Sequence, residues 1–368
     1  MLLFKIALPS DVTTIGVNEI HQNRKEPYPK TIKVYEKQTV EVYESKYFLS
    51  VYPTKESLLI FKVNEKDIHY QSEVPSAKSN EQVQYGPYKD LAPITFEQIQ
   101  LFFTFPYPLP VFTEAKRDIF VSHWGEISVD EYFNFFNLAA GIDGQFSRID
   151  YMPHINPNQG QNAVADLSIE FPDYIHGLYY YDYIGNISSS SARRNNGKVE
   201  MVYQLRFPVF GQWKIDWNMG YMMPTQHHLY KDIKNDLEHT LEVDLMHGYD
   251  SSLTEDFHVR VILPEGSSNI RVILPSGCVS EDMISMDKYF GTLDFFGRPT
   301  VNINMKNVVF DLCDDKLRVK YHFNQATDFM IEPISMFAMV MSLYLVAMIY
   351  VRVGLNLEEE KQPKEKAN

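Results

Sequence analysis

The C-terminal end of the chain constrains its fold most strongly. An uncharged, mainly apolar run extends from Ile334 to Val351, and a polar tail follows it. As a helix, these 18 residues would span about 27 Å, close to the hydrocarbon thickness of a bilayer. A buried core helix is the alternative, but the run carries no charge and Arg352 closes it. We therefore predict a transmembrane helix over residues 332–353 and a cytosolic tail over residues 354–368.

Charged residues on the two sides of this run predict its orientation. Asp328 and Glu332 precede the run, whereas Arg352 and three lysines follow it. Because Lys and Arg favour the cytosolic side of a membrane, we expect the residues before the run to lie in a lumen. Lys364 and Lys366 are fifth and third from the C-terminus, as in the dilysine signal that retrieves endoplasmic-reticulum membrane proteins. A solvated tail is the alternative for these lysines. The two features together predict a single-pass type I protein of the endoplasmic reticulum membrane.

Length and charge limit the classes of protein further. About 330 residues precede the predicted span, which is more than one hydrophobic core usually holds, so we expect two domains. The formal net charge of −14 argues against a nucleic-acid partner, because such proteins carry a basic face. Cys278 and Cys313 are the two cysteines. In an oxidising lumen they could form a disulfide, and two buried free thiols are the alternative.

The N-terminal residues do not have the pattern of a secretory signal peptide. Lys5 interrupts the first apolar stretch, and no small-residue cleavage site follows. A luminal protein needs such a signal. We therefore expect that an upstream segment is missing from this sequence and that the first domain is incomplete.

Alternation of apolar and polar residues predicts a mainly β protein. Residues 257–261 and 317–323 alternate with period two, as half-buried strands do. Residues 57–63 and 99–105 are more continuously apolar and are predicted to be central strands. Turn sequences rich in Gly and Pro separate these segments, and no helical periodicity precedes the predicted span. This pattern is typical of antiparallel sandwiches.

A proline-rich segment suggests where the two domains meet. Residues 106–110 read Pro-Tyr-Pro-Leu-Pro, which favours a rigid, extended connection. We predict two antiparallel, β-sandwich-like luminal domains over residues 1–115 and 116–328, followed by the transmembrane helix.

One modification site and one helix face can be predicted from the residues. Asn186 begins an Asn-Ile-Ser sequon before a serine-rich loop, so it is a candidate for N-glycosylation in a lumen. Ser335, Ala338 and Ser342 recur at helical spacing, and small residues of this kind let a second transmembrane helix approach closely. The eleven histidines show no spacing of metal ligands. We find no phosphate loop and no nucleophile motif, so we predict no catalytic, cofactor or metal residues.

Several segments resemble one known family. They include Val-Ser-His-Trp-Gly-Glu from Val121 and Gln-Phe-Ser-Arg-Ile-Asp-Tyr from Gln145. Further similar segments are 27–29, 52–55, 85–90, 182–188, 206–214, 262–266, 295–299 and 321–324. In order and spacing they resemble ribophorin I, a subunit of oligosaccharyltransferase. The resemblance covers most of the chain, although Cys278 and Cys313 match no cysteine of that family.

The resemblance implies a function without an active site in this chain. Ribophorin I is an accessory subunit of the complex that moves a glycan from dolichol diphosphate to Asn in Asn-X-Ser/Thr. The chemistry belongs to a separate polytopic subunit. The implied partners are other subunits of the complex and nascent polypeptides at the translocation channel. A membrane-anchored luminal binding module, such as a lectin-like cargo receptor or chaperone, is the alternative, and an enzyme in its own right is a third hypothesis.

Overall fold

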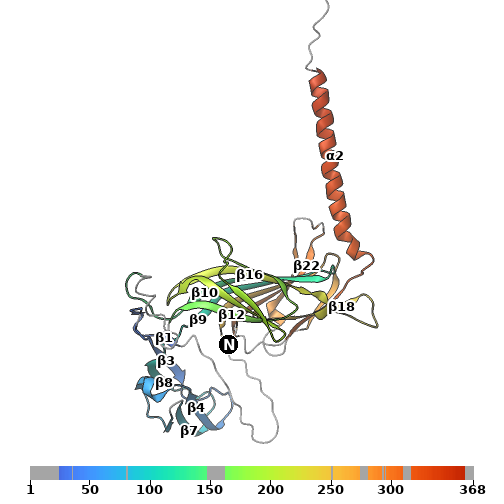
Figure 1. The fold of residues 1–368 in the computed structure, drawn as a ribbon. Helices are drawn as coiled ribbons and strands as arrows, with labels where there is room; N and C mark the ends of the chain where they lie inside the picture. Colours follow the sequence, from blue (N-terminus) through green and yellow to red (C-terminus); the bar gives the residue numbers. More distant parts are fainter. Residues whose placement is uncertain are drawn as a thin grey trace, which may run out of the picture.

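The computed structural model has three parts: a small N-terminal β unit, a large β sandwich and a long C-terminal helix (Figure 1). It describes residues 25–34, 36–79, 82–146, 162–249, 252–273, 281–291, 294, 296–309 and 316–360, without the side chains of 25, 281 and 354–360. The expectation of a mainly β chain that ends in one apolar helix is confirmed for these residues.

The larger layer of the sandwich is a seven-stranded sheet, in the order β13-β16-β10-β9-β19-β22-β21. Its strands are β9 (Pro110–Val121), β10 (Glu126–Asn137), β13 (His176–Tyr181), β16 (Lys214–Pro224), β19 (Leu253–Ile262), β21 (Ile284–Tyr289) and β22 (Arg298–Val309). All neighbours are antiparallel except β9 and β19, which run parallel with Val111 opposite Leu253. The sheet is therefore mixed and not purely antiparallel. A parallel pair needs a long crossover, and the many strands between β9 and β19 in the chain provide it.

Two smaller sheets form the second layer. One has the order β12-β15-β14, and the other has the order β17-β18-β23-β20. Their strands are β12 (Val164–Pro172), β14 (Ser191–Asn195), β15 (Lys198–Val209), β17 (Leu229–Lys231), β18 (Glu238–Asp244), β20 (Ser268–Ile273) and β23 (Lys316–His322). Leu317, Val319 and Tyr321 are buried on β23, so the alternation in the sequence does report the buried face of this strand.

The core of the sandwich lies between these two layers. On β10 the buried positions Ile127, Val129, Phe133 and Phe135 alternate with half-exposed ones, as period two requires. Trp217 of β16 is fully buried beside the rings of Phe112, Phe133, Phe135 and Tyr249. Among the residues that the structure describes, 40 buried apolar residues form one continuous cluster. Burial of this size stabilises the sandwich chiefly through the hydrophobic effect.

The N-terminal unit contains two small sheets, ordered β1-β3-β8-β5 and β4-β7-β6. Their strands are β1 (Lys25–Pro27), β3 (Thr39–Ser45), β4 (Thr54–Phe61), β5 (Ile68–Gln71), β6 (Ala77–Lys78), β7 (Val83–Leu91) and β8 (Gln98–Thr104). The prediction of a central strand is confirmed for residues 99–105, because β8 has a neighbour on each side. It is wrong for residues 57–63. There β4 lies at the edge of its sheet with Leu58 and Ile60 exposed, so an apolar run did not mean burial.

Polar contacts join the N-terminal unit to the sandwich. The short strands β2 (Thr31–Ile32) and β11 (Gly141–Ile142) pair in parallel. The buried amide of Gln38 accepts a hydrogen bond from the backbone N–H of Ala140 and donates one to the carbonyl of Tyr107. Asn137 accepts from the backbone N–H groups of Leu109 and Ala139 and donates to two carbonyls. These buried amides fix the linker between the two units because their hydrogen-bonding groups are satisfied.

Sheet membership bears on the predicted domain boundary near residue 115. That residue lies inside β9, and the whole of β9 belongs to the seven-stranded sheet. Residues 98–104 belong to the N-terminal unit. We therefore propose to place the boundary within residues 105–109, a few residues before the predicted position, while keeping the division into two domains as a proposal.

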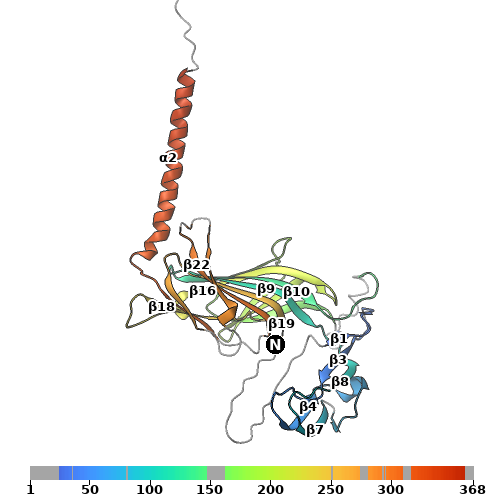
Figure 2. The same ribbon diagram turned by 180° about the vertical axis from the view of Figure 1, so that it is seen from behind.

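The long helix leaves one end of the sandwich and points away from it, whereas the N-terminal unit lies toward the other end (Figures 1 and 2). It is α2 (Ile331–Glu360), and the 3-10 turn η7 (Asp328–Met330) leads into it. The other short 3-10 turns are η2 (Glu65–Asp67), η4 (Thr225–His227) and η5 (Glu281–Met283). Five residues separate β23 from η7, so the connection to the helix is short.

Candidate membrane anchor and its junction with the sandwich

Helix α2 is the candidate membrane anchor. The segment from Asp328 to Val353 is long and apolar enough to cross a bilayer, and none of its apolar window is buried against the rest of the protein. A core helix of a soluble domain would bury its apolar side chains, but here they face outward on all sides of the helix. The geometry therefore favours a membrane span over a core helix.

The small residues predicted as a packing face lie on this helix with their hydroxyl groups already bonded. Ser335 Oγ donates to the carbonyl of Glu332 at 2.8 Å, and Ser342 Oγ donates to the carbonyl of Met339 at 2.7 Å. Ala338 and Ser342 are exposed. Because the hydroxyl groups bond to their own helix, small size is the property that this face offers to a partner helix.

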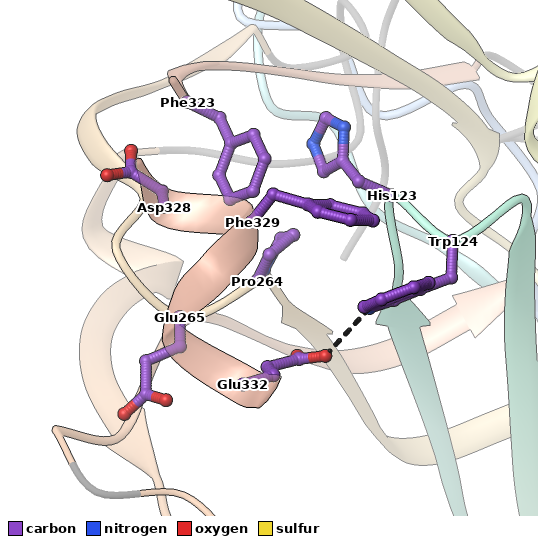
Figure 3. Close-up of a pocket in the computed structure, with 8 residues that line it drawn as sticks. All are labelled: His123, Trp124, Pro264, Glu265, Phe323, Asp328, Phe329 and Glu332. Carbon is purple, nitrogen blue, oxygen red and sulfur yellow. Dashed lines mark hydrogen bonds between the residues drawn. The ribbon is translucent and has the colours of Figure 1, made fainter. Parts of the chain in front are cut away.

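A polar clamp holds the first turn of α2 against the sandwich. Trp124 Nε1 donates to Glu332 Oε2 at 2.9 Å (Figure 3). Arg298 Nη2 donates to the other oxygen of the same carboxylate, Glu332 Oε1, at 3.0 Å. Arg298 also pairs with Asp294 at 3.0 Å. Trp124 comes from the turn between β9 and β10, and Arg298 begins β22. Both oxygens of one carboxylate are thus bonded to two different parts of the large sheet, which fixes the position of the helix start.

Apolar and backbone contacts complete this joint. The ring centroids of Trp124 and Phe329 are 4.1 Å apart. Gly266 adopts φ +92°, and a Cβ there would lie 3.0 Å from both Asp328 and Ile331, so this position favours glycine. The space enclosed among these side chains is about 10 Å³, which holds at most one water molecule. The joint is therefore a packed contact and not a ligand pocket.

His123 connects the same turn to the second layer of the sandwich. Its ring stacks on Phe323 with centroids 4.0 Å apart, and its Nε2 lies 2.9 Å from the hydroxyl of Tyr321. Burial, followed by the neighbouring His239, lowers the pKa of His123 to about 4. The imidazole is therefore neutral at physiological pH and acts here as a packing and hydrogen-bonding group.

A buried ion pair lies inside the sandwich. Arg117 on β9 and Glu131 on β10 stand directly opposite each other and form an ion pair. Arg117 Nη2 also donates to the hydroxyl of Tyr221 at 3.0 Å. Burial would lower the pKa of Arg117, but Tyr221 and Glu131 outweigh it and raise the pKa above its usual value. Arg117 Nε and Glu131 Oε2 are buried without a hydrogen-bond partner among the described residues, so the pair uses only part of its hydrogen-bonding capacity. The pair joins β9 to β10 and, through Tyr221, to β16, which indicates a structural role.

A cavity of about 210 Å³ adjoins this pair, where β12 and the segment after β18 approach each other over the large sheet. Its apolar lining includes Phe171, Met223 and Met246, and its polar lining includes Arg117 and His228. Pockets for small organic ligands usually measure about 300–1,000 Å³. The cavity is therefore smaller than a typical small-molecule or cofactor site.

The predicted glycosylation site lies on an exposed loop with a well-defined backbone. The side chain of Asn186 is exposed, and its backbone forms an isolated antiparallel β-bridge with Tyr181. The buried carboxylate of Asp182 accepts from the backbone N–H groups of Ile184 and Gly185, and Arg206 pairs with it. The hydrogen bond from Arg206 lowers the pKa of Asp182, so the carboxylate that organises the loop stays ionised. Asn186 is therefore accessible at the end of a fixed turn.

Four predicted residues lie outside the described part of the chain: Cys278, Cys313, Lys364 and Lys366. The disulfide and the retrieval signal therefore remain predictions. Within the described residues, no group of three or more His, Cys, Asp or Glu side chains is arranged to hold a metal ion.

Comparison with known proteins identifies the family. A family model described as Ribophorin I matches residues 2–351. The chain belongs to the ribophorin I family. The resemblance seen in the sequence segments is thereby confirmed over nearly the whole chain.

Relatives of the chain carry consistent names. It is 30% identical over 363 residues to dolichyl-diphosphooligosaccharide–protein glycosyltransferase subunit 1A of Arabidopsis thaliana, covering 97% of this chain and 58% of the relative. It is 29% identical over 359 residues to subunit 1B of Oryza sativa subsp. japonica, covering 95% of this chain and 72% of the relative. Subunit 1 of Caenorhabditis elegans is 29% identical over 350 residues, with 94% and 58% covered. The chain thus spans less than two thirds of the length of two of these relatives.

Solved structures add little to this assignment. An M1 zinc metallopeptidase from Deinococcus radiodurans aligns with a TM-score of 0.32 and 10% identity, over 57% of this chain and 42% of that one. A likeness this weak carries no argument about fold or activity.

Sequence reasoning missed two features of this member of the family. The first is the clamp of Glu332 by Trp124 and Arg298, for which the sequence offered only an acidic residue just before the span. The second is the pair of Arg117 and Glu131. Its signal was present, because both residues occupy inward positions in the alternation of β9 and β10. Opposite charges at inward positions of two adjacent strands indicate a buried pair.

Proposed function

We propose that this chain is a non-catalytic accessory subunit of the oligosaccharyltransferase complex in the endoplasmic reticulum membrane. It supports protein N-glycosylation through assembly of the complex and presentation of substrates. Transfer of the glycan from dolichol diphosphate to Asn in Asn-X-Ser/Thr is assigned to a polytopic partner subunit. The partners are other subunits of the complex and nascent polypeptides at the translocation channel.

The match to the ribophorin I family over residues 2–351 is the observation that carries this proposal. The names of the relatives, all subunit 1 of the glycosyltransferase, support it. The architecture is compatible with such a role, because one apolar helix is clamped to a large folded domain. A subunit of this shape would hold a folded surface beside a membrane enzyme.

Recovery of the complex tests the proposal against its alternative. The tagged full-length chain, purified from mild detergent, should bring down other transferase subunits in fixed proportion. A lectin-like cargo receptor or chaperone would instead bring down diverse glycoproteins or unfolded chains in variable amounts. Recovery of cargo without any transferase subunit would reject the accessory assignment.

A second experiment separates an accessory subunit from an enzyme. The purified chain, mixed with a lipid-linked oligosaccharide, an acceptor peptide and Mn²⁺ or Mg²⁺, should produce no glycopeptide. The intact complex is the positive control in the same assay. Transfer by this chain alone would overturn the non-catalytic assignment.

The proposed orientation places the sandwich in the lumen and the tail in the cytosol. With a signal sequence added, Asn186 should carry a high-mannose glycan, because it is exposed on a fixed turn. Endoglycosidase treatment should increase gel mobility of the wild type and leave Asn186→Gln unchanged. An unglycosylated sandwich that protease digests in intact microsomes would contradict the orientation.

The small-residue face of α2 is the proposed contact with a partner helix. Ala338→Leu with Ser342→Leu should preserve membrane insertion but reduce recovery of partner subunits, because bulk would block close approach. Met341→Leu with Met348→Leu, about a quarter turn around the helix from this face and nearly unchanged in volume, is the matched control. Equal recovery with both double variants would exclude this face.

The retrieval signal and the disulfide have direct tests as well. Lys364→Ser with Lys366→Ser should let a reporter that carries the isolated tail leave the endoplasmic reticulum. Mass spectrometry of unreduced peptides should find Cys278 joined to Cys313. A reporter that stays in place without the lysines, or two alkylated free cysteines, would contradict the respective prediction.

A further inference from the structure

The end of the sandwich that carries α2 exposes several large apolar side chains. They are Trp124 at 59% exposure, Phe290 at 62%, Phe296 at 64% and Met330 at 51%. In a soluble domain, large apolar side chains gathered at one end mark an interaction surface. A protein partner or a membrane normally covers such a surface.

Strand register places these residues at one end of the large sheet. Val121 pairs with Ile127 on either side of the Trp124 turn, and Phe120 pairs with Ile262. Ile262 in turn pairs with Thr300. The turn of Trp124 and the segment between β21 and β22, which carries Phe290 and Phe296, therefore lie at the same end as the start of α2.

Backbone and ring contacts order part of this end. Phe290 lies over Gly297, where a Cβ would approach its ring to 2.8 Å. The backbone N–H of Phe296 donates to the buried carboxylate of Glu265. Tyr289 packs edge-on against Phe120, with centroids 5.6 Å apart. Ordered aromatic rings form a better contact surface than freely rotating ones, because less conformational entropy is lost when they bind.

The position of Trp124 along the axis of α2 identifies the surroundings of this surface. Its indole N–H bonds to Glu332, which precedes the first residue of the apolar run, Ile334, by two positions. At about 1.5 Å per residue, the backbone of Glu332 lies roughly 3 Å from the level of Ile334, so the indole that bonds to its carboxylate lies near the start of the apolar run. Trp at this level is characteristic of the membrane–water interface, where an apolar ring and a polar N–H are both accommodated.

We propose that this end of the sandwich rests on the bilayer, with Trp124, Phe290, Phe296 and Met330 in the zone of the lipid headgroups. The occupant of the surface is zwitterionic phospholipid. The charges at this end do not favour anionic lipid, because the two cations Arg298 and Lys288 are outnumbered by the carboxylates of Glu265, Asp294, Asp328 and Glu332. Apolar contact, and not attraction to anionic lipid, holds the surface. The proposal needs only that α2 crosses a membrane and is independent of the role in glycosylation.

Tryptophan fluorescence of the full chain in phosphatidylcholine vesicles tests this contact. The chain has three tryptophans; Trp217 is fully buried, and Trp213 lies beside Phe210 at the opposite end of the large sheet. Phosphatidylcholine brominated near the headgroup should remove up to about one third of the fluorescence, and Trp124→Phe should abolish that loss. Bromine near the chain ends should quench less, as expected for residues of the interface.

Two further variants, both in the Trp124→Phe background, compare a tryptophan on the proposed surface with an equally exposed tryptophan elsewhere. Phe296→Trp should restore quenching by the brominated lipid. Phe96→Trp is the matched control, because Phe96 is equally exposed at 64% but belongs to the N-terminal unit; it should show no quenching. If neither Trp124 nor Phe296→Trp is quenched in vesicles where α2 is inserted, the surface does not contact lipid and the proposal fails. Quenching that appears only after addition of phosphatidylglycerol would also overturn it, because the contact would then be electrostatic.

Discussion

The sandwich and the N-terminal unit are both built from short strands, but they bury very different amounts of apolar surface. The sandwich has one continuous cluster of 40 buried apolar residues. The described part of the N-terminal unit has two separate clusters, one of five residues that includes Leu109 of the linker and one of three. Val51, Val74 and Phe96 of this unit are largely exposed. β-Rich sequence alone therefore says little about stability, because stability follows the size of the shared core.

The difference also explains how the two units are joined. The sandwich holds the N-terminal unit through the buried amides of Gln38 and Asn137 and through the pairing of β2 with β11. A unit with small cores gains order from such fixed attachments. We expect the sandwich to unfold as one cooperative body and the N-terminal unit to open at lower free energy.

Removal of the largest ring in the sandwich core should have the greatest effect. Trp217→Ala should reduce the free energy of unfolding of the sandwich by about 3–5 kcal/mol, because it leaves a cavity among four aromatic rings. Urea unfolding in detergent, followed by circular dichroism, measures this loss. Trp217→Phe is the matched control and should lose clearly less. Equal losses for the two variants would show that this site is not tightly packed.

Breaking the buried ion pair should cause the next largest loss in the free energy of unfolding. Glu131→Ala should cost about 3 kcal/mol, at the lower end of the range for buried pairs, because Arg117 keeps its bond to Tyr221. Replacing both partners by Met should restore most of that loss, since no buried charge is then left unpaired. The same unfolding experiment compares the two proteins. A double variant as unstable as the single one would mean that the pair contributes more than it costs to desolvate.

A matched deletion in the N-terminal unit should have a smaller and local effect. Leu101 is fully buried on β8, and Leu101→Ala should cost about 2 kcal/mol, at the lower end for such deletions. Hydrogen exchange should increase across the N-terminal unit and stay unchanged in the sandwich. Exchange that rises equally in both units would show that they unfold together, and the N-terminal unit would then not open at lower free energy than the sandwich.

Acid should weaken the sandwich through a buried histidine. His247 Nε2 lies 2.9 Å from Thr254 Oγ1, and its Nδ1 accepts from the backbone N–H of Tyr249. Burial, with Arg117 nearby, lowers its pKa from 6.5 to about 3. The contribution of His247 to the free energy of unfolding is therefore fully present above pH 6.5 and is lost as the pH falls from 6.5 toward 3. In this range the histidine of the unfolded chain binds a proton while the buried one stays neutral.

Protonation of His247 in the unfolded chain should already lower the free energy of unfolding at mildly acidic pH. One unit below 6.5, at pH 5.5, His247 should account for a loss of about 1.4 kcal/mol in the free energy of unfolding. Unfolding curves at pH 7.5 and pH 5.5 measure it. His247→Gln should be less stable at both values but should lack this part of the pH dependence. An unchanged pH dependence in the variant would exclude His247 as its source.

The sequence predicted much of this fold where the pattern was local. The apolar run that became α2 and the alternating strand β23 needed no knowledge of distant partners. The parallel pairing of β9 with β19 could not be predicted, because it joins strands more than 130 positions apart. The edge position of β4 was missed since an apolar run does not reveal whether another layer covers it. The clamp on Glu332 depends on two turns that only the tertiary fold brings together.

The clamp at Glu332 also determines how the protein would respond to the bilayer itself. A helix longer than the local hydrocarbon thickness tilts to fit it. Because the first turn of α2 is bonded to both the Trp124 turn and β22, the helix cannot tilt alone. A change in membrane thickness would therefore rotate the whole sandwich and alter the height of the N-terminal unit above the membrane.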